Sequence, residues 1–284
     1  MTTPIDDRTT GTFTLGDRTV RRLGFGAMQI TGEGIWGPPP DHDEAIAVLR
    51  RAVELGINLI DTADSYGPEV SENLIAEALH PYPDDLVIAT KAGLLRTGPG
   101  QWPTDGRPEH IREACEGSLR RLKVDRIDVY QFHRPDPQVP FEESVGTFAE
   151  LQQEGKVAHV GLSNVTVDQL RRAQAIVPIV SVQNRYNLVE RNDQDVLEAC
   201  EAADIGFIPW LPLKSGGLTR DRGVVGEVAK AHGAAPAQVA LAWLLARSPV
   251  MLPIPGTQNL QHLEDNCAAA KLKLTSDEWK SLAA

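Results

Sequence analysis

Short runs of consecutive hydrophobic residues recur along this chain and alternate with longer amphipathic segments. The runs lie at 22–26, 57–61, 86–91, 127–132, 157–162, 179–184, 205–210 and 249–254. Most of them are apolar at successive positions, which is the pattern of strands that are buried on both faces of a sheet. The pattern therefore predicts eight parallel strands.

The segments between the runs carry the spacing and end signals of helices. The segment from about Asp43 to Leu55 places its apolar residues on one face and stops at Gly56, a residue that favours a left-handed C-cap. Another begins near Pro108, because proline is favoured in the first turn of a helix. Strands that alternate with helices predict an α/β fold, and eight such units closing on themselves make a (β/α)8 TIM barrel.

The two ends of the chain add smaller elements. Residues 12–15 and 18–20, joined by a Gly-Asp turn, predict an N-terminal β-hairpin. Thr275 and Glu278 have the spacing of a capping box and predict a short C-terminal helix. No linker, low-complexity run or block of like charge interrupts the pattern, so residues 1–284 are expected to form a single domain.

Length and charge narrow the class of protein. The 284 residues suit one barrel, for which roughly 250 residues are typical. A net charge of −11 argues against nucleic acid as a partner, which needs a basic face. No apolar stretch reaches the roughly 18 residues of a membrane span, and the first residues show no basic region followed by an apolar run. We therefore expect a cytoplasmic protein without a membrane partner.

The cysteines and histidines predict no metal centre. Cys115, Cys200 and Cys267 are widely separated, so neither a disulfide framework nor a thiolate site is indicated. The histidines do not cluster with acids or cysteines at ligand spacing, and we expect no metal.

Four polar residues follow three successive strands of the predicted barrel. Asp61 ends one strand, with Tyr66 five residues on, while Lys91 ends the next and His133 follows the third. In a βα barrel the carboxyl ends of the strands face one mouth, where residues are available for chemistry. The joint occurrence of an acid, a phenol, an amine and an imidazole predicts a catalytic site.

Elementary electrostatics assigns each of the four a task. The Lys91 ammonium at the end of an apolar strand needs a partner, and Asp61 is the candidate. A cation beside a phenol favours the phenolate, so Lys91 is expected to lower the pKa of Tyr66 and prepare it for proton transfer. His133 offers a donor that would orient a carbonyl group. These groups polarise a carbonyl but supply no electrons, so a hydride donor is required.

The chain resembles the aldo-keto reductases over nearly its whole length. Residues 23–28 are similar to the first strand of that family, and residues 155–157 and 161–164 are similar to its fifth. The resemblance implies that Asp61, Tyr66, Lys91 and His133 are the catalytic residues, with Tyr66 as general acid. It further implies NADPH as cofactor, with NADH possible, and a small-molecule carbonyl substrate.

The resemblance also implies a set of cofactor contacts. Ser163, Asn164 and Gln183 would bond the nicotinamide carboxamide, Trp210 would stack on the nicotinamide, and Leu213 and Ser215 would line the pyrophosphate. Segment 254–266 would hold the adenosine end. The implied contacts are Gly26, Ala27, Met28, Asp61, Ser163, Asn164, Gln183, Trp210, Leu211, Leu213, Ser215, Ile254, Gly256, Thr257, Gln258, His262, Asp265 and Asn266.

Two departures from the family pattern affect the ends of the cofactor and substrate sites. Many relatives carry an arginine for the 2′-phosphate where this chain has His262, which predicts a weaker preference for NADPH. Only a short helix follows Asn266, so a long C-terminal lid is not expected. The loop at 30–37 must then supply part of the pocket wall, and Trp36 is the candidate substrate contact, with Tyr66 and His133.

Two alternatives remain open on the sequence. Some proteins of this fold bind the nucleotide tightly and act as regulatory or redox-sensing subunits. A Schiff-base chemistry at Lys91 is compatible with Asp61 and Tyr66 but has no need of Trp210. Among reductases, the overall pattern resembles bacterial members that include pyridoxal reductases, and we expect a monomer or a weak oligomer.

Overall fold

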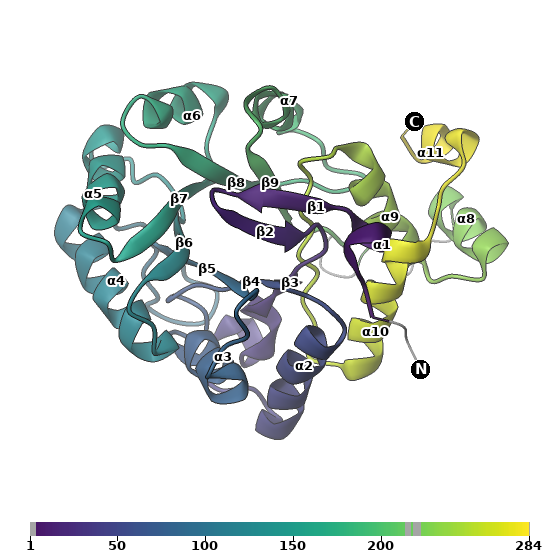
Figure 1. Ribbon diagram of the computed structural model, residues 1–284, viewed down its shortest axis with the longest axis horizontal. Helices are drawn as coiled ribbons and strands as arrows, with labels where there is room; N and C mark the ends of the chain where they lie inside the picture. Colours follow the sequence, from purple (N-terminus) through teal and green to yellow (C-terminus); the bar gives the residue numbers. More distant parts are fainter. Residues whose placement is uncertain (1–3, 214–216, 218–222, 284) are drawn as a thin grey trace.

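The computed structural model describes residues 4–213, 217 and 223–283 and shows a ring of parallel strands surrounded by helices (Figure 1). Seven strands form one sheet in chain order, each parallel to the next. They are β3 Phe25–Gly26, β4 Leu59–Asp61, β5 Val87–Ala92, β6 Ile127–Phe132, β7 Val157–Ser163, β8 Ile179–Arg185 and β9 Gly206–Trp210.

The eighth expected strand, at 249–254, is not a regular strand, although it joins the two edges of the sheet. Phe207 of β9 exchanges two backbone hydrogen bonds of 2.8 Å with this segment, and Gly24 donates to the carbonyl of Pro253 at 3.0 Å. Pro253 has no N–H, so a regular ladder lacks a donor there. The prediction of eight regular strands was wrong at this segment, whereas the (β/α)8 class is confirmed.

The closure brings backbone into contact with backbone at two glycines. A Cβ atom on Gly26 would lie 2.6 Å from the carbonyl oxygen of Ile254, and one on Gly256 would lie 2.3 Å from that of Gly26. Only glycine permits such an approach. Strand β3 and the segment that follows residue 253 therefore meet at the end of the barrel where Asp61 lies, since Gly26 pairs with Asp61.

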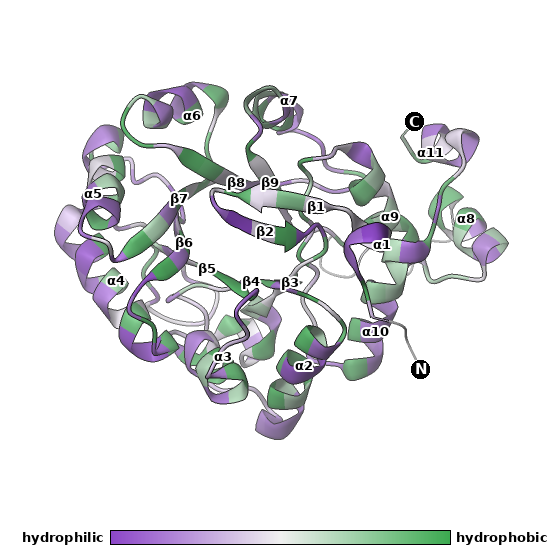
Figure 2. Ribbon diagram, viewed as in Figure 1, coloured by the Kyte–Doolittle hydropathy of each residue, from purple (hydrophilic) through white to green (hydrophobic). Residues whose placement is uncertain are grey.

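Helices cover the outside of the ring, with their apolar faces turned inward and their polar faces turned to solvent (Figure 2). The α-helices are α1 Asp7–Thr10, α2 His42–Glu54, α3 Val70–Leu79, α4 Pro108–Leu122, α5 Phe141–Gln153, α6 Val167–Gln174, α7 Gln194–Ala203, α8 Val224–His232, α9 Pro236–Arg247, α10 Leu260–Ala268 and α11 Ser276–Ala283. The 3-10 helices are η1 Ala27–Ile30, η2 Glu33–Ile35 and η4 Ala269–Lys271. Two predicted helix boundaries are confirmed. One helix stops at Gly56, whose φ is 88°, and another begins at Pro108.

The N-terminal hairpin, β1 Thr12–Leu15 with β2 Arg18–Arg21, lies across one opening of the barrel (Figure 1). Phe13 and Leu15 belong to the same buried cluster as the barrel strands. Asn58, which precedes β4, donates to the Thr19 carbonyl and accepts from the Arg21 amide. The hairpin thus closes the end where the strands begin and leaves the opposite end for the site.

In the part of the chain that the structure describes, no helix has the length and apolar character needed to cross a membrane.

Candidate active site

Lys91 is the centre of a buried polar cluster at the carboxyl ends of β4 and β5. Its side chain is fully buried, and Nζ donates to Asp61 Oδ1 at 2.5 Å, to the Thr62 carbonyl at 2.8 Å and to the Tyr66 hydroxyl at 3.3 Å. Burial alone lowers the pKa of the ammonium, but Asp61 and Tyr66 outweigh it and raise the pKa above its ordinary value. Lys91 is therefore protonated at neutral pH, which disfavours it as a Schiff-base nucleophile.

Asp61 is held by three donors. Besides Lys91, its Oδ2 accepts from the side-chain amides of Gln131 at 2.9 Å and Gln183 at 2.7 Å. Sequence reasoning missed Gln131, although an uncharged polar residue next to the carboxyl end of β6 was a usable signal. The carboxylate is fully compensated, which is the condition under which a buried ion pair is tolerated.

Tyr66 contradicts one expectation. Burial in the apolar mouth raises the pKa of its phenol above the ordinary value, and this effect exceeds the lowering by Lys91. The expected net lowering was therefore wrong, because the desolvation of the phenolate costs more than one nearby cation returns. Lys91 still draws the pKa down from where burial alone would set it, and Tyr66 stays a protonated donor through neutral pH.

His133 follows β6 and packs its ring against Tyr66. The two ring centroids are 5.8 Å apart at 82°, and His133 Nδ1 lies 3.4 Å from Ser65 Oγ. Burial, followed by the charges of Lys91 and Arg134, lowers the pKa of the imidazole well below its ordinary value. A neutral imidazole keeps one N–H donor, which is what the orientation of a carbonyl oxygen requires.

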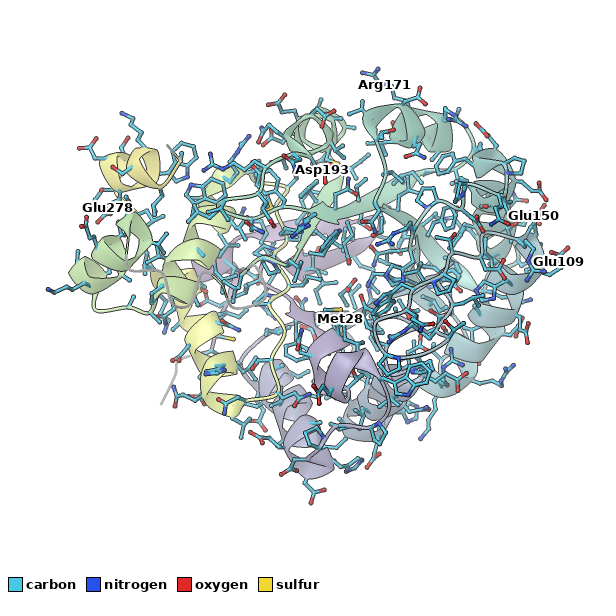
Figure 3. All side chains as sticks on the ribbon, turned by 180° about the vertical axis from the view of Figure 1, so that it is seen from behind. Met28, Glu109, Glu150, Arg171, Asp193 and Glu278 are labelled. Carbon is cyan, nitrogen blue, oxygen red and sulfur yellow. The ribbon has the colours of Figure 1, made fainter. Side chains whose placement is uncertain are left out.

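A cleft of about 910 Å³ opens from Tyr66 and Asp61 and extends to the start of α10. A volume of this size is at the upper end of those typical for small-molecule and cofactor sites. Met28, labelled near the middle of Figure 3, lines it, whereas Glu109, Glu150 and Arg171 lie on helices at the periphery. Of the predicted contacts, the lining includes Gly26, Met28, Asp61, Gln183, Trp210, Leu211, Leu213, Ile254, Gly256, Thr257, Gln258, His262, Asp265 and Asn266.

Three predicted contacts do not line this cleft. Ala27 is buried, and its carbonyl accepts from Ser71 Oγ at 3.0 Å. Asn164, at a φ of 58°, donates to the carbonyl of His133 at 3.0 Å and to Ser163 Oγ at 2.9 Å. In this arrangement Ser163 and Asn164 support the loop of His133. Ser215 lies outside the described residues.

Sequence reasoning also missed part of the cleft lining. Most of the missed residues are small or lie in loops, where no side-chain chemistry marked them. They are Gln29, Pro212, Ala235 and Ala237, whereas Pro255 and Asn259 belong to the predicted segment 254–266.

The side chain of Trp210 gives the cleft a wall that can be compared with the shape of a planar cofactor. It lies at the end of β9 and lines the cleft, with the guanidinium carbon of Arg185 5.4 Å from its ring centroid. Its indole Nε1 is buried and has no hydrogen-bond partner among the described residues. A flat apolar wall with an unused donor fits a planar heteroaromatic ring, so the residues present fit a nicotinamide cofactor.

At the α10 end of the cleft, one of the predicted cofactor contacts is already occupied by hydrogen bonds within the protein. Gln258 Nε2 donates to the carbonyls of Gln29 and of Thr31, the latter at 2.7 Å, so it is not free to serve as a phosphate donor. Asn259 caps α10 by accepting the amide of His262 at 3.0 Å. The exposed His262 side chain is therefore the predicted phosphate contact that stays unconstrained by these bonds.

Trp36 lies in the loop after η2, beside the site and outside the cleft lining. Its backbone pairs with Gly67, and its ring lies 5.5 Å from the guanidinium carbon of Arg96. A second indole, Trp102, is also outside that lining and meets the Tyr66 ring, with ring centroids 6.4 Å apart. Arg96 and Trp102 were not predicted, because both belong to an irregular loop without a strand or helix signal.

Asp64, three residues after Asp61, is a second acidic group with a buried carboxyl oxygen. Asp64 Oδ1 is buried without a hydrogen-bond partner among the described residues. Burial and the charge of Glu72 raise the pKa of Asp64 to about 8. Glu72 itself is fully buried and accepts from Arg121 Nε at 2.6 Å.

The described residues include no group of three or more His, Cys, Asp or Glu side chains placed to hold a metal ion. Within them, the cluster offers a protonated phenol, a fixed cation and a neutral imidazole at one mouth of a cofactor-sized cleft. Such a set can polarise a carbonyl and deliver a proton to its oxygen.

Comparison with known proteins agrees with this arrangement. Residues 22–284 match the model of the aldo/keto reductase family. An uncharacterized oxidoreductase of Schizosaccharomyces pombe is 51% identical over 98% of this chain and 90% of that protein. The pyridoxine 4-dehydrogenase of Escherichia coli is 45% identical over 95% of this chain and 96% of that protein. An aldo/keto reductase from Klebsiella pneumoniae, solved with NADP and acetate, superposes with a TM-score of 0.82 at 28% identity, over 95% of this chain and 93% of that one.

Proposed function

This chain belongs to the aldo/keto reductase family, and we propose that it is an NADPH-dependent reductase of aldehydes or ketones in which Tyr66 is the general acid. The observation that carries the proposal is the buried contact of Lys91 Nζ with both Asp61 and the Tyr66 hydroxyl, at 2.5 and 3.3 Å. A cation has no structural need to be buried beside a phenol. A proton donor, by contrast, needs a cation that stabilises the phenolate it leaves behind.

Each residue then has a distinct task. Tyr66 donates its proton to the carbonyl oxygen as negative charge develops there, and Lys91 stabilises the resulting phenolate. Asp61, with its amide donors Gln131 and Gln183, keeps Lys91 charged and in place. Neutral His133 donates its N–H to the same carbonyl oxygen and orients it.

The cofactor would occupy the 910 Å³ cleft. When bound there, NADPH supplies the hydride that the protein's side chains lack. Trp210 would pack on the nicotinamide ring, and the residues around the start of α10 would hold the adenosine end. The solved relative that contains NADP supports this assignment.

The proposed substrate is a small aromatic or heteroaromatic aldehyde of the pyridoxal class. The support is the 45% identity to a protein named pyridoxine 4-dehydrogenase, whose name describes the reverse oxidation of an alcohol. The aromatic surroundings of Tyr66 suit such a ring.

The test is steady-state consumption of NADPH with pyridoxal, benzaldehyde and propanal, with NADH assayed side by side. We expect turnover with NADPH, and weaker turnover with NADH. Tight binding of NADPH without consumption of any of the three aldehydes would contradict the proposal and favour a regulatory nucleotide-binding subunit.

A further inference from the structure

The loop between β5 and α4 folds back on itself beside Tyr66. Leu94 pairs with Thr104 in an antiparallel bridge, and the Leu95 amide donates to the Pro103 carbonyl at 2.8 Å. We call residues 94–104 the β5–α4 hairpin. Its register sets Arg96 opposite Trp102, and the guanidinium carbon lies 3.7 Å from the centroid of the indole. The pair is thus a cross-strand stack of a cation on an aromatic face.

Arg96 joins this hairpin to two other loops at the mouth of the barrel. Its NH1 donates to the carbonyls of Ile35 at 2.7 Å and Ser65 at 2.9 Å, and its NH2 donates to that of Gly34 at 3.1 Å. Ser65 immediately precedes Tyr66 and contacts His133, as described above. One guanidinium therefore fixes the loop of Trp36, the loop of Tyr66 and the β5–α4 hairpin relative to one another.

Arg96 is not placed to bind a substrate itself. Its terminal N–H groups are directed to backbone carbonyls, and its Nε is buried without a partner among the described residues. A substrate anion would have to displace one of these carbonyl acceptors to reach a terminal N–H group. The guanidinium contacts carbonyl oxygens and the faces of two indoles, and none of the contacts described above is with a carboxylate. These are the contacts of a residue that positions its neighbours.

Trp102 is the side chain that this arrangement holds against the reaction site. Its indole is half-buried and meets the Tyr66 ring edge to face, at 83° and 6.4 Å between centroids. His133 meets the same ring at 82° and 5.8 Å. Two aromatic rings thus stand nearly perpendicular to the phenol, and a planar ring attached to a carbonyl at the Tyr66 hydroxyl would pack on them with favourable geometry.

We propose that Trp102, positioned by Arg96, determines specificity for planar aromatic carbonyl substrates over saturated ones of the same size. This inference rests on the proposed reductase function and adds the residues that select the substrate. Trp36 contacts Arg96, at 5.5 Å, and braces the guanidinium that holds Trp102. Trp36 therefore acts through Arg96 and Trp102 on the substrate.

The experiment compares benzaldehyde with cyclohexanecarbaldehyde, which have the same carbon count and differ in planarity and aromaticity. The measured quantity is the ratio of their kcat/KM values with NADPH. We expect Trp102→Leu to lower this ratio about tenfold, mainly through KM for benzaldehyde, and Trp102→Phe to retain most of it. Arg120→Met, which removes an exposed cation from α4, is the matched control for Arg96→Met and should leave the ratio unchanged.

A double-mutant cycle tests whether Arg96 acts through Trp102. Arg96→Met should lower the ratio to a similar extent, and the variant with both changes should lower it no further, because the second change removes nothing that the first left in place. Arg96→Lys, which keeps the charge but loses the planar fork, should be intermediate. An unchanged ratio in Trp102→Leu, or additive effects in the double variant, would overturn the proposal.

A binding measurement separates this proposal from the reductase proposal. Calorimetry with benzyl alcohol and cyclohexylmethanol, with and without NADP⁺, needs no turnover. We expect Trp102→Leu to weaken benzyl alcohol about tenfold and to leave cyclohexylmethanol nearly unchanged. If the wild-type protein reduces no aldehyde, the reductase proposal fails, whereas this binding measurement still decides the role of Trp102. Equal loss of both alcohols would contradict that role.

Discussion

The two sides of the reaction site are built in different ways. On the strand side, Lys91, Asp61 and Gln131 are buried and bond one another through side chains. On the rim, Arg96 and Gln258 come from loops, and their side chains donate to backbone carbonyls. The strand side is a closed set of charges in which each group needs the others. On the rim, hydrogen bonds between loops fix the shape of the mouth of the barrel.

This difference shows where a substitution should affect the chemical step and where it should affect specificity for the substrate or the cofactor. Removal of one member of the buried cluster leaves a charge without its partner, which costs both activity and stability. Removal of a rim group keeps every side chain of the buried cluster and is expected to change mainly which molecules fit. The following experiments test that division, beginning with the largest expected effect.

Lys91→Met is expected to break the strand side completely. The variant leaves Asp61 as a buried carboxylate without a cation and leaves the Tyr66 phenolate unstabilised. We expect kcat to fall by roughly a thousandfold or more and the free energy of unfolding to fall by about 3 to 5 kcal/mol. Steady-state kinetics and urea denaturation measure the two effects.

Lys230→Met, at an exposed position of α8, is the control for the loss of a lysine and should change neither quantity. A Lys91→Met protein with full activity would show that the coupling of Lys91 to Tyr66 has no part in turnover.

Asp64→Asn sharpens the comparison, because Asp64 lies beside the buried cluster yet lacks a bonding partner for Oδ1 in the described residues. Its pKa of about 8 is above its ordinary value near 3.8. The folded protein thus holds this proton more tightly than the unfolded chain, and the stability it contributes is lost as pH rises from about 4 to about 8. The uncharged Asn removes this loss.

We expect the Asp64→Asn variant to gain stability relative to wild type as pH rises through that window, by at least about 1.4 kcal/mol at pH 8.5, the equivalent of one pKa unit. Denaturation at pH 5.0 and 8.5 measures it, with Asp125→Asn, at an exposed position, as control. A stability difference that is the same at both pH values would refute the assignment of a raised pKa to Asp64.

His262→Arg tests the rim at the cofactor end, where the smallest effect is expected. A guanidinium on the first turn of α10 can form a charge-assisted hydrogen bond with a 2′-phosphate, so Kd for NADPH should fall about fivefold, roughly 1 kcal/mol, while Kd for NADH stays constant. Gln261→Arg, one residue away, controls for added charge. Equal tightening of both nucleotides would mean that this turn does not recognise the 2′-phosphate.

The sequence predicted the strand side better than the rim for a physical reason. Lys91 and His133 end apolar runs, so the βα pattern alone places them at one mouth. Trp102 and Arg96 meet only because the β5–α4 hairpin brings them together, and no periodicity encodes such a loop. The same limit applies to Gln258, whose bonds to the loop at Gln29 join residues far apart in the chain.

Two further expectations failed through energetic competition. Segment 249–254 had the apolar composition of a strand, but its prolines remove ladder donors, and only isolated bonds close the ring. The pKa of Tyr66 depends on how far burial opposes Lys91, and the depth of burial is a property of the folded mouth. A sequence identifies the groups that interact, while the fold decides which interaction is larger.

The most direct test of the account is Tyr66→Phe, which removes a single oxygen atom from the contact with Lys91. Cofactor affinity, measured by quenching of protein fluorescence with NADPH, should stay within about twofold of wild type, because the ring itself is kept. The value of kcat for pyridoxal or benzaldehyde should fall by roughly a hundredfold or more, because the proton donor is lost. Normal turnover by a folded Tyr66→Phe protein would contradict the role of Tyr66 as the general acid and, with it, the mechanism proposed for this site.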